Sequence, residues 1–183
     1  VKIYKIKTSD FKNMEKYIKG DHRFKNQKRA KKDIVFTWAK KEFKNLSLAK
    51  SAGANAPMPI IVFENILVME FIGDKTQAAK TLRETKPQQK ELEDFYRQTI
   101  EFISKIFFKK ELIHADLSEY NILSHNNKLV FIDMGQSVLS SHPNAKEFFE
   151  RDVKNMADYF SRKGISTSFE QMLEEIKAKK AEF

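Results

Sequence analysis

Two long stretches of helical periodicity, each next to a short apolar hairpin pattern, constrain the fold of this 183-residue chain most strongly. From Asp33 apolar residues recur at spacings of three and four until Gly53, which predicts a helix with Asp33 as its N-cap. Residues 91–109 have the same periodicity and predict a second helix. Hairpins are predicted at 60–72, turning at Glu64-Asn65, and at 122–132, turning within 124–128. This order of elements predicts an α+β protein with a lobe boundary near Gly73.

Three further elements complete the predicted fold. Residues 1–6 have the pattern of a strand that no turn or cap precedes, so we expect more chain before Val1. Asn144 is the predicted N-cap of a helix that ends at Gly164. Thr167 and Glu170 have the spacing of a capping box and predict the start of a final helix.

The composition excludes several classes of protein. The absence of cysteine excludes a disulfide scaffold, a thiolate metal site and a cysteine nucleophile. No run approaches 18 apolar residues, so no membrane span and no membrane partner are expected. The net charge of +9 is concentrated in a basic cluster formed by Lys25, Lys28, Arg29, Lys31 and Lys32. Such a cluster fits nucleic acid, anionic lipid or a phosphorylated ligand, and it fits a solvated surface equally well.

Glu42 does not fit the apolar pattern of its predicted helix. It lies four residues after Trp38 and four before Leu46, on the face that should be buried. A buried carboxylate is costly unless a cation meets it, and Lys2 on the first strand is a candidate. The alternative is that Glu42 lies at the edge of the apolar face and reaches water.

A second group of polar residues flanks the predicted hairpin at 122–132. The end of its second strand returns beside the start of its first, so Asn121 and Asp133 can converge. One carboxylate and one amide oxygen make a site suited to Mg²⁺, which takes its other ligands from water and phosphate. Asp116 lies nearby in the sequence and could accept a proton. Asp116 and Asn121 would also be ordinary turn residues.

Together these residues resemble the motifs of protein kinases. The matching positions are Lys2 for the strand lysine, Glu42 for its helix partner, His114-Ala115-Asp116 for His-Arg-Asp, Asn121 for the metal-binding asparagine, and Asp133-Met134-Gly135 for Asp-Phe-Gly. The segments WAKKEFKNL, HADLSEYNIL and FIDMGQSVLSSHPNA resemble more specifically the RIO family of atypical serine/threonine protein kinases. The similarity is strongest to an archaeal form of its type 1 branch.

The resemblance implies a trimmed two-lobe kinase fold, with a partial N-lobe at 1–72 and a C-lobe at 73–183. It implies ATP and Mg²⁺ as cofactors, ATPase activity beside protein phosphorylation, and a cytoplasmic role in maturation of the small ribosomal subunit, with a pre-ribosomal particle or ribosomal RNA as partner. The implied site residues are Lys2 and Glu42 for the phosphates, Asp133 and Asn121 for Mg²⁺, Asp116 as proton acceptor, and Met69, Glu70 and Ile72 beside adenine. Family members also phosphorylate their metal-binding aspartate, which makes Asp133 a candidate acceptor.

Two departures from the family pattern stand out. The glycine-rich phosphate loop would lie before Val1, so the chain as written is not expected to bind ATP normally. Ala115 replaces the arginine that pairs with a phosphorylated activation loop, so activation by that route is not expected. Two alternatives remain: a non-catalytic RNA-binding assembly factor on a kinase fold, and a small-molecule kinase of the aminoglycoside phosphotransferase type. The sequence does not predict the physiological phosphate acceptor, which of ATP hydrolysis and protein phosphorylation dominates, or the oligomeric state.

Overall fold

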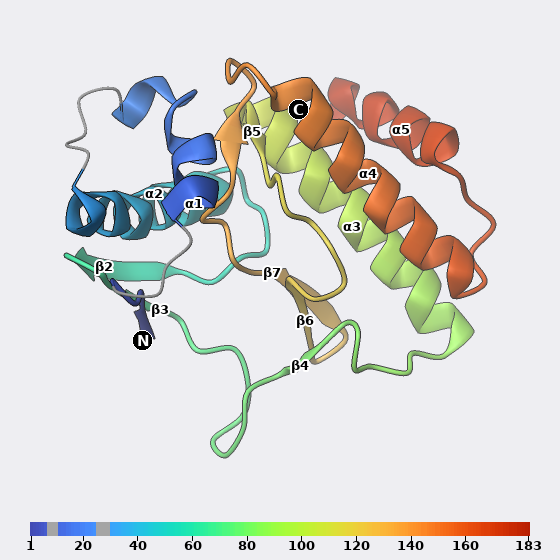
Figure 1. The fold of residues 1–183 in the computed structure, drawn as a ribbon. Helices are drawn as coiled ribbons and strands as arrows, with labels where there is room; N and C mark the ends of the chain where they lie inside the picture. The colour runs from blue at the N-terminus through green and yellow to red at the C-terminus, as the bar shows by residue number, and fades with distance from the viewer. Residues whose placement is uncertain (7–10, 25–29) are drawn as a thin grey trace.

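The computed structural model describes residues 1–6, 11–24 and 30–183 and confirms an α+β architecture (Figure 1). The helices are α1 (Phe11–Ile18), α2 (Lys31–Ser51), α3 (Gln89–Lys110), α4 (Ala145–Arg162) and α5 (Phe169–Ala178). The strands are β1 (Lys2–Ile3), β2 (Pro59–Phe63), β3 (Ile66–Met69), β4 (Lys80–Thr81), β5 (Leu112–Ile113), β6 (Ile122–His125), β7 (Lys128–Phe131) and β8 (Val138–Leu139). Short 3-10 helices lie at His22–Phe24 and Lys179–Glu182. No helix of the described part of the chain is long and apolar enough to cross a membrane.

The first sheet has the antiparallel order β1-β3-β2 and contains the predicted first hairpin. The turn lies at Glu64-Asn65, where Glu64 has a positive φ of 50°. Two of the strands in this sheet were predicted too long. β1 has two residues instead of six, and β3 ends at Met69 instead of Ile72. β3 stops pairing with β2 after Met69, and the Glu70 N–H instead binds the Met58 carbonyl at 2.8 Å.

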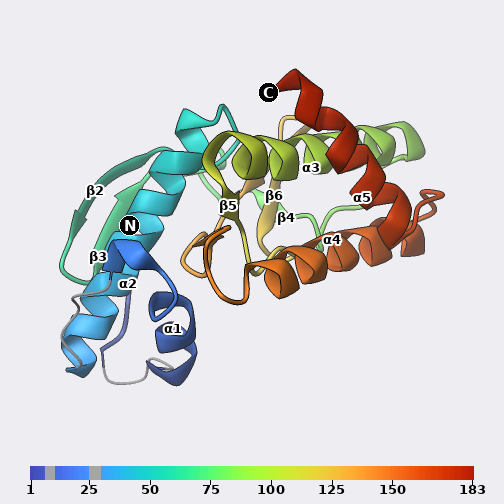
Figure 2. The same cartoon turned by 90° about the horizontal axis from the view of Figure 1, so that it is seen from above.

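Helix α2 lies between the β2–β3 hairpin and α1, and it begins earlier than predicted (Figure 2). Its N-cap is Ala30, so the prediction of Asp33 as N-cap was wrong. Asp33 lies in the first turn, where a negative charge is favourable to the helix dipole. Gly53 follows the last turn with a φ of 76°, a conformation that glycine adopts at little cost. The predicted end of α2 was therefore correct.

The second sheet, β4-β6-β7, contains the second predicted hairpin. Its turn is tighter than predicted, since only Asn126 and Asn127 lie outside the strands and both have positive φ. Asparagine tolerates this left-handed conformation, which suits a two-residue hairpin turn. Strand β4 and the separate pair β5-β8 were not predicted from the sequence.

The C-terminal helices follow the predicted order, with two local corrections. Asn144 is the N-cap residue of α4, but its side chain binds Glu147 instead of a backbone N–H. The N-cap of α5 is Ser168, whose hydroxyl accepts a hydrogen bond from the Gln171 N–H at 3.3 Å. The capping box that we predicted at Thr167 was therefore wrong.

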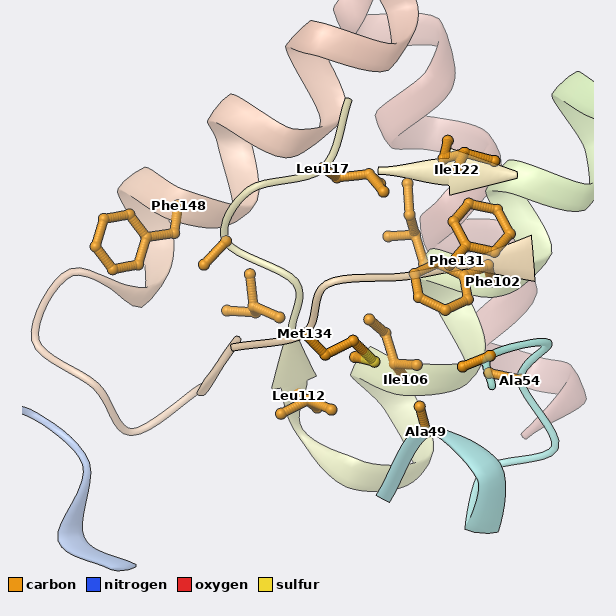
Figure 3. Packing of buried hydrophobic residues seen from close by; sticks show 14 of the residues in the cluster. Ala49, Ala54, Phe102, Ile106, Leu112, Leu117, Ile122, Phe131, Met134 and Phe148 are labelled. Atoms are coloured by element: carbon orange, nitrogen blue, oxygen red, sulfur yellow. The ribbon is translucent and has the colours of Figure 1, made fainter. Parts of the chain in front are cut away.

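The hydrophobic core joins the end of α2 to α3 and to the second hairpin (Figure 3). Phe102 of α3 stacks on Phe131 of β7 with ring centroids 3.8 Å apart. Met134, three residues after the end of β7, is fully buried in the same cluster, close to Leu112 and Ala49 (Figure 3). Packing of Met134 anchors the loop that follows β7, and this loop carries Asp133.

Candidate active site

A lysine and two carboxylates from three distant segments meet at the N-terminal strand. Lys2 Nζ lies 3.0 and 2.9 Å from the two carboxylate oxygens of Glu42 on α2. It also lies 2.9 Å from Asp133 Oδ1 in the loop after β7. Glu42 is fully buried, so the alternative in which it reaches water was wrong. The predicted Lys2–Glu42 pair is present, and Asp133 joins it.

Burial and the ion pair act in opposite directions on these groups. Burial raises the pKa of Glu42 to about 7, while the ammonium of Lys2 acts to lower it. Burial acts to lower the pKa of Lys2, but the charges of Glu42 and Asp133 outweigh it and raise that pKa. The hydroxyl of Tyr4 donates a further hydrogen bond to Glu42, a partner that the sequence analysis missed. Lys2 is therefore held as a cation, in a position fixed by Glu42.

Asp116 and Asn121 also lie together, in the loop between β5 and β6. Asn121 Nδ2 donates to the Asp116 backbone carbonyl at 2.8 Å and to Asp116 Oδ2 at 3.1 Å. Gln136 Nε2 donates to the same Oδ2 at 2.8 Å, a contact that the sequence analysis also missed. Burial, together with the nearby charge of Asp133, raises the pKa of Asp116. Asp116 is thus a partly buried carboxylate with one oxygen already hydrogen-bonded.

The backbone around Asp116 is fixed by a buried aspartate of α4. Asp152 Oδ2 accepts a hydrogen bond from the Ala115 N–H at 2.7 Å, and its Oδ1 accepts one from the Leu117 N–H at 2.9 Å. Ala115 itself has a φ of 65°, unusual for a residue other than glycine, and Arg151 donates to its carbonyl. Asp152 was missed, although it lies on the apolar face of its helix just as Glu42 does.

His114, the first residue of the kinase-like motif, is buried beside the same loop. Its Nε2 lies 3.0 Å from the Ile132 carbonyl, so this nitrogen carries the proton. Burial lowers the pKa of His114 to about 4. The imidazole is therefore neutral at physiological pH and links the loop of Asp116 to the end of β7.

The donors available for a metal are oxygens. The backbone carbonyl of Asn121 accepts a hydrogen bond from the Ile132 N–H at 2.9 Å, which places Asn121 beside the start of the loop that carries Asp133. Because Asn121 Nδ2 binds Asp116, its amide oxygen is directed elsewhere and accepts no hydrogen bond from a described residue. In the described ranges no three His, Cys, Asp or Glu side chains cluster as metal ligands. A carboxylate and an amide oxygen fit Mg²⁺, which keeps several waters and takes ligands from phosphate.

The segment predicted to contact adenine follows β3. The Glu70 N–H binds the Met58 carbonyl, and the Ile72 carbonyl accepts from the Ala79 N–H at 3.0 Å. The Glu70 carbonyl and the Ile72 N–H have no backbone partner among the described residues. One acceptor and one donor two residues apart could bind the edge of a purine, with Met69 beside them.

The predicted basic cluster is only partly described. Residues 25–29 lie outside the described ranges, so most of the cluster is not placed. Lys32 is exposed at the start of α2, with its ammonium 5.0 Å from the Phe36 ring centroid. The nearby Arg23 is bound to Asp21 at 2.6 Å and to Asn45 at 2.9 Å, so this guanidinium has a structural role. A nucleic-acid surface here stays a prediction.

Lys41, next to Glu42 on α2, is a fully buried lysine whose hydrogen bonds to described residues all go to backbone carbonyls. Its Nζ donates to the Gly135 carbonyl at 3.0 Å and to the Ser137 carbonyl. Burial, helped by the charge of Arg23, lowers the pKa of Lys41 to about 7, and Asp21 only partly opposes this. The spacing of three residues from Trp38 places Lys41 on the buried face and could have revealed it.

The depressed pKa of Lys41 predicts a pH-dependent stability. Between pH 7 and 9 the unfolded chain holds the Lys41 proton more fully than the folded one, so the Lys41 contribution to stability rises with pH. The unfolding free energy of the wild type minus that of Lys41→Met should therefore rise, by at most about 1.4 kcal/mol per pH unit. Urea unfolding of both proteins at pH 7, 8 and 9 measures it. A difference that stays constant across this range would contradict the prediction.

Comparisons with known proteins identify the family of this chain. A family model of the RIO domain matches residues 1–172. The chain is 41% identical over 174 residues to the RIO-type serine/threonine-protein kinase Rio1 of Haloferax volcanii, covering 95% of this chain and 59% of that protein. It is 41% identical over 179 residues to the protein of the same name from Thermoplasma acidophilum, covering 98% of this chain and 93% of that one.

A solved structure shows the same fold. The Rio2 kinase of Chaetomium thermophilum, crystallised as an ADP/Mg²⁺–phosphoaspartate complex, matches with a TM-score of 0.64 and 25% identity. The match covers 78% of this chain and 44% of the Rio2 chain. With the family model spanning nearly all of the sequence, and relatives named as serine/threonine kinases aligned over the same region, the chain belongs to the RIO family of atypical protein kinases.

Proposed function

We propose that the protein containing this chain transfers the γ-phosphoryl group of ATP as an atypical serine/threonine kinase with ATPase activity. The observation that carries the proposal is the position of Lys2, 2.9 Å from both a Glu42 oxygen and Asp133 Oδ1. A cation fixed by a buried carboxylate beside a partly exposed carboxylate suits the phosphates of a metal-bound nucleotide. The names of the aligned relatives support the same activity.

Each residue of the site has one task in the proposed reaction. Lys2, oriented by Glu42, binds the α- and β-phosphates. Asp133 and the Asn121 amide oxygen would hold Mg²⁺, which neutralises charge on the phosphate oxygens when bound. Asp116 accepts the proton of the attacking hydroxyl or water through its second carboxylate oxygen. The Glu70 carbonyl and Ile72 N–H bind adenine beside Met69.

Asp133 is also a candidate phosphate acceptor. The Rio2 structure is described as containing a phosphoaspartate with ADP and Mg²⁺. Transfer from ATP to Asp133 would form a carboxyl–phosphate bond and release ADP, and water would then hydrolyse that bond. An acid-stable, hydroxylamine-resistant phosphoprotein as the sole product would argue against this route.

The biological setting belongs to the proposal as well. A role in maturation of the small ribosomal subunit, a pre-ribosomal particle or ribosomal RNA as partner, and a cytoplasmic place of action are implied by the family resemblance. We propose likewise that residues 1–72 form a partial N-lobe and residues 73–183 a C-lobe.

Asp116→Asn tests the proposed function. The amide keeps the size and the local hydrogen-bonding capacity of Asp116 but cannot accept the proton, so the rate should fall by about 10²- to 10⁴-fold. Turnover of γ-labelled ATP with Mg²⁺ measures this in the complete protein, with and without pre-ribosomal particles. Asp158→Asn, at an exposed position of α4, is the control and should keep the wild-type rate.

Three other outcomes are informative. No turnover by the wild type, with or without particles, would favour a non-catalytic assembly factor. Full turnover by Asp116→Asn would remove Asp116 from the mechanism. Efficient transfer to an aminoglycoside but not to protein or water would favour a small-molecule kinase.

A further inference from the structure

We propose that Gln136 is a positioning residue for Asp116 and that helix α2 fixes Gln136 through Lys41 and Asn45. The same helix would then place both the phosphate-binding lysine, through Glu42, and the proton acceptor. This inference rests on the proposed function, because it assumes that Asp116 accepts a proton.

Gln136 contacts Asp116 directly through its side-chain amide. Gln136 Nε2 lies 2.8 Å from Asp116 Oδ2, and Asn121 Nδ2 lies 3.1 Å from the same oxygen. Reversing the Gln136 amide would direct its oxygen at the carboxylate, so the N–H must be the group that faces Asp116. Two donors from different loops thus converge on one oxygen.

The consequence is a carboxylate with two different oxygens. Oδ2 is occupied by both amides, whereas Oδ1 has no hydrogen-bond partner among the described residues. Two donors on Oδ2 fix the rotation of the carboxylate and leave Oδ1 for an incoming hydroxyl. With one donor removed, the group could rotate, and the reacting geometry would be held for less of the time.

Lys41 in turn forms hydrogen bonds with the backbone on both sides of Gln136. Lys41 Nζ donates to the Gly135 carbonyl at 3.0 Å and to the Ser137 carbonyl. These carbonyls belong to the residues immediately before and after Gln136. Lys41 is fully buried, and both of its described hydrogen bonds go to this loop.

Asn45, one turn further along α2, makes a parallel pair of bonds. Its Nδ2 donates to the Met134 carbonyl at 2.8 Å and to the Ser137 carbonyl at 2.9 Å. Its Oδ1 accepts from Arg23 at 2.9 Å, and Asp21 in turn binds Arg23. Arg23 therefore fixes which way the Asn45 amide faces, with its oxygen toward Arg23 and its nitrogen toward the loop.

Close packing of the loop on α2 is independent support. A Cβ placed on Gly135 would lie 2.7 Å from Trp38 Nε1, closer than carbon and nitrogen atoms approach. Only glycine therefore allows the backbone to lie this near the helix. Four hydrogen bonds and this contact leave the backbone at 134–137 little freedom, so the Cα position of Gln136 is fixed relative to α2.

Gln136→Met tests the contact between Gln136 and Asp116, because methionine has a similar length but no N–H group to donate. A lost hydrogen bond to a charged group should lower kcat about tenfold to a hundredfold. The KM for ATP and the affinity for ADP with Mg²⁺ should change less than about twofold, because Asp116 does not bind the nucleotide. Gln171→Met at an exposed position of α5 is the matched control and should leave all these quantities unchanged.

The double variant separates positioning from a general structural effect. In the Asp116→Asn background Gln136→Met should cause no further loss of rate, since it acts only through the Asp116 carboxylate. An equal additional loss there would overturn the proposal. If Asp116→Asn lowers the rate but Gln136→Met does not, the inference fails while the proposed function stands. Full turnover by Asp116→Asn would remove Asp116 from the mechanism and the inference with it, whereas no ATP turnover by the wild type would refute the proposed function itself.

The role of α2 is tested by Asn45→Ala, which removes two of the four bonds and leaves Lys41 in place. We expect kcat to fall several-fold in the wild-type background and to change little in the Gln136→Met background. Thermal unfolding confirms that each variant is folded at the assay temperature. Equal losses in both backgrounds would show that Asn45 does not act through Gln136.

Discussion

Asp133→Asn is expected to abolish nucleotide turnover in the complete protein, with a loss of at least about two orders of magnitude. The substitution removes the negative charge that would bind Mg²⁺ and that now binds Lys2 at 2.9 Å. Asn is the informative replacement because Asp133 has a φ of 60°, which asparagine tolerates better than most residues other than glycine. Asp133→Ala should show the same loss of turnover, with an added cost from the strained backbone.

Turnover of γ-labelled ATP and affinity for ADP at several Mg²⁺ concentrations measure this effect. We expect Mg²⁺-dependent ADP binding to weaken, whereas the metal-independent part should stay. Asp158→Asn on α4 again serves as the control. Retained turnover in Asp133→Asn would remove this residue from the metal site and from the role of phosphate acceptor.

Asp152→Ala is expected to cause the largest loss of stability. The Asp152 carboxylate accepts the N–H groups of Ala115 and Leu117, and these donors would become unsatisfied in a buried place. The cost of two such groups is roughly 2–6 kcal/mol of unfolding free energy. Because both donors flank Asp116, the folded fraction of the variant should also turn over ATP more slowly.

Urea unfolding gives the stability change, and turnover measured below the unfolding transition gives the effect on the site. Asp158→Ala, six residues further along the same helix but exposed, should change the unfolding free energy by no more than about 0.5 kcal/mol. A cost for Asp152→Ala as small as that of the control would mean that water replaces the lost acceptor.

The long elements were predictable because their periodicity repeats over several turns. The apolar face of α2 recurs from Val35 to Ala49, and only a helix places these residues on one side. The strands β4, β5 and β8 have two residues each, too few to show any alternation. Their extended conformation depends on partners far away in the sequence, such as β8 for β5.

Helix starts were less predictable because several polar residues compete for the N-cap position. At α5 the choice is made by a distant contact: the Thr167 hydroxyl lies 2.9 Å from the Tyr96 hydroxyl, and Ser168 caps the helix instead. At α2 the N-cap position falls on Ala30, whose side chain cannot accept a hydrogen bond from the first turn.

The residues of the candidate site were likewise predictable only in part. A carboxylate on an apolar face predicted that Glu42 needs a buried cation, and Lys2 is that cation. The same criterion applied to α4 would have indicated Asp152. No local pattern could indicate Tyr4 or Gln136, because the groups they bind lie 38 and 20 residues away.

The amino-acid sequence by itself determined the helices, the two hairpins and the order of the charged residues along them, since these follow from local spacing and side-chain chemistry. Only the tertiary structure decided that Lys2 binds Glu42 and Asp133 together, and that α2 holds the backbone around Gln136. The physical reason is that these contacts join segments about 40 to 130 residues apart. Their geometry is set by how α2 packs on the loop after β7, and residue spacing carries no information about that packing.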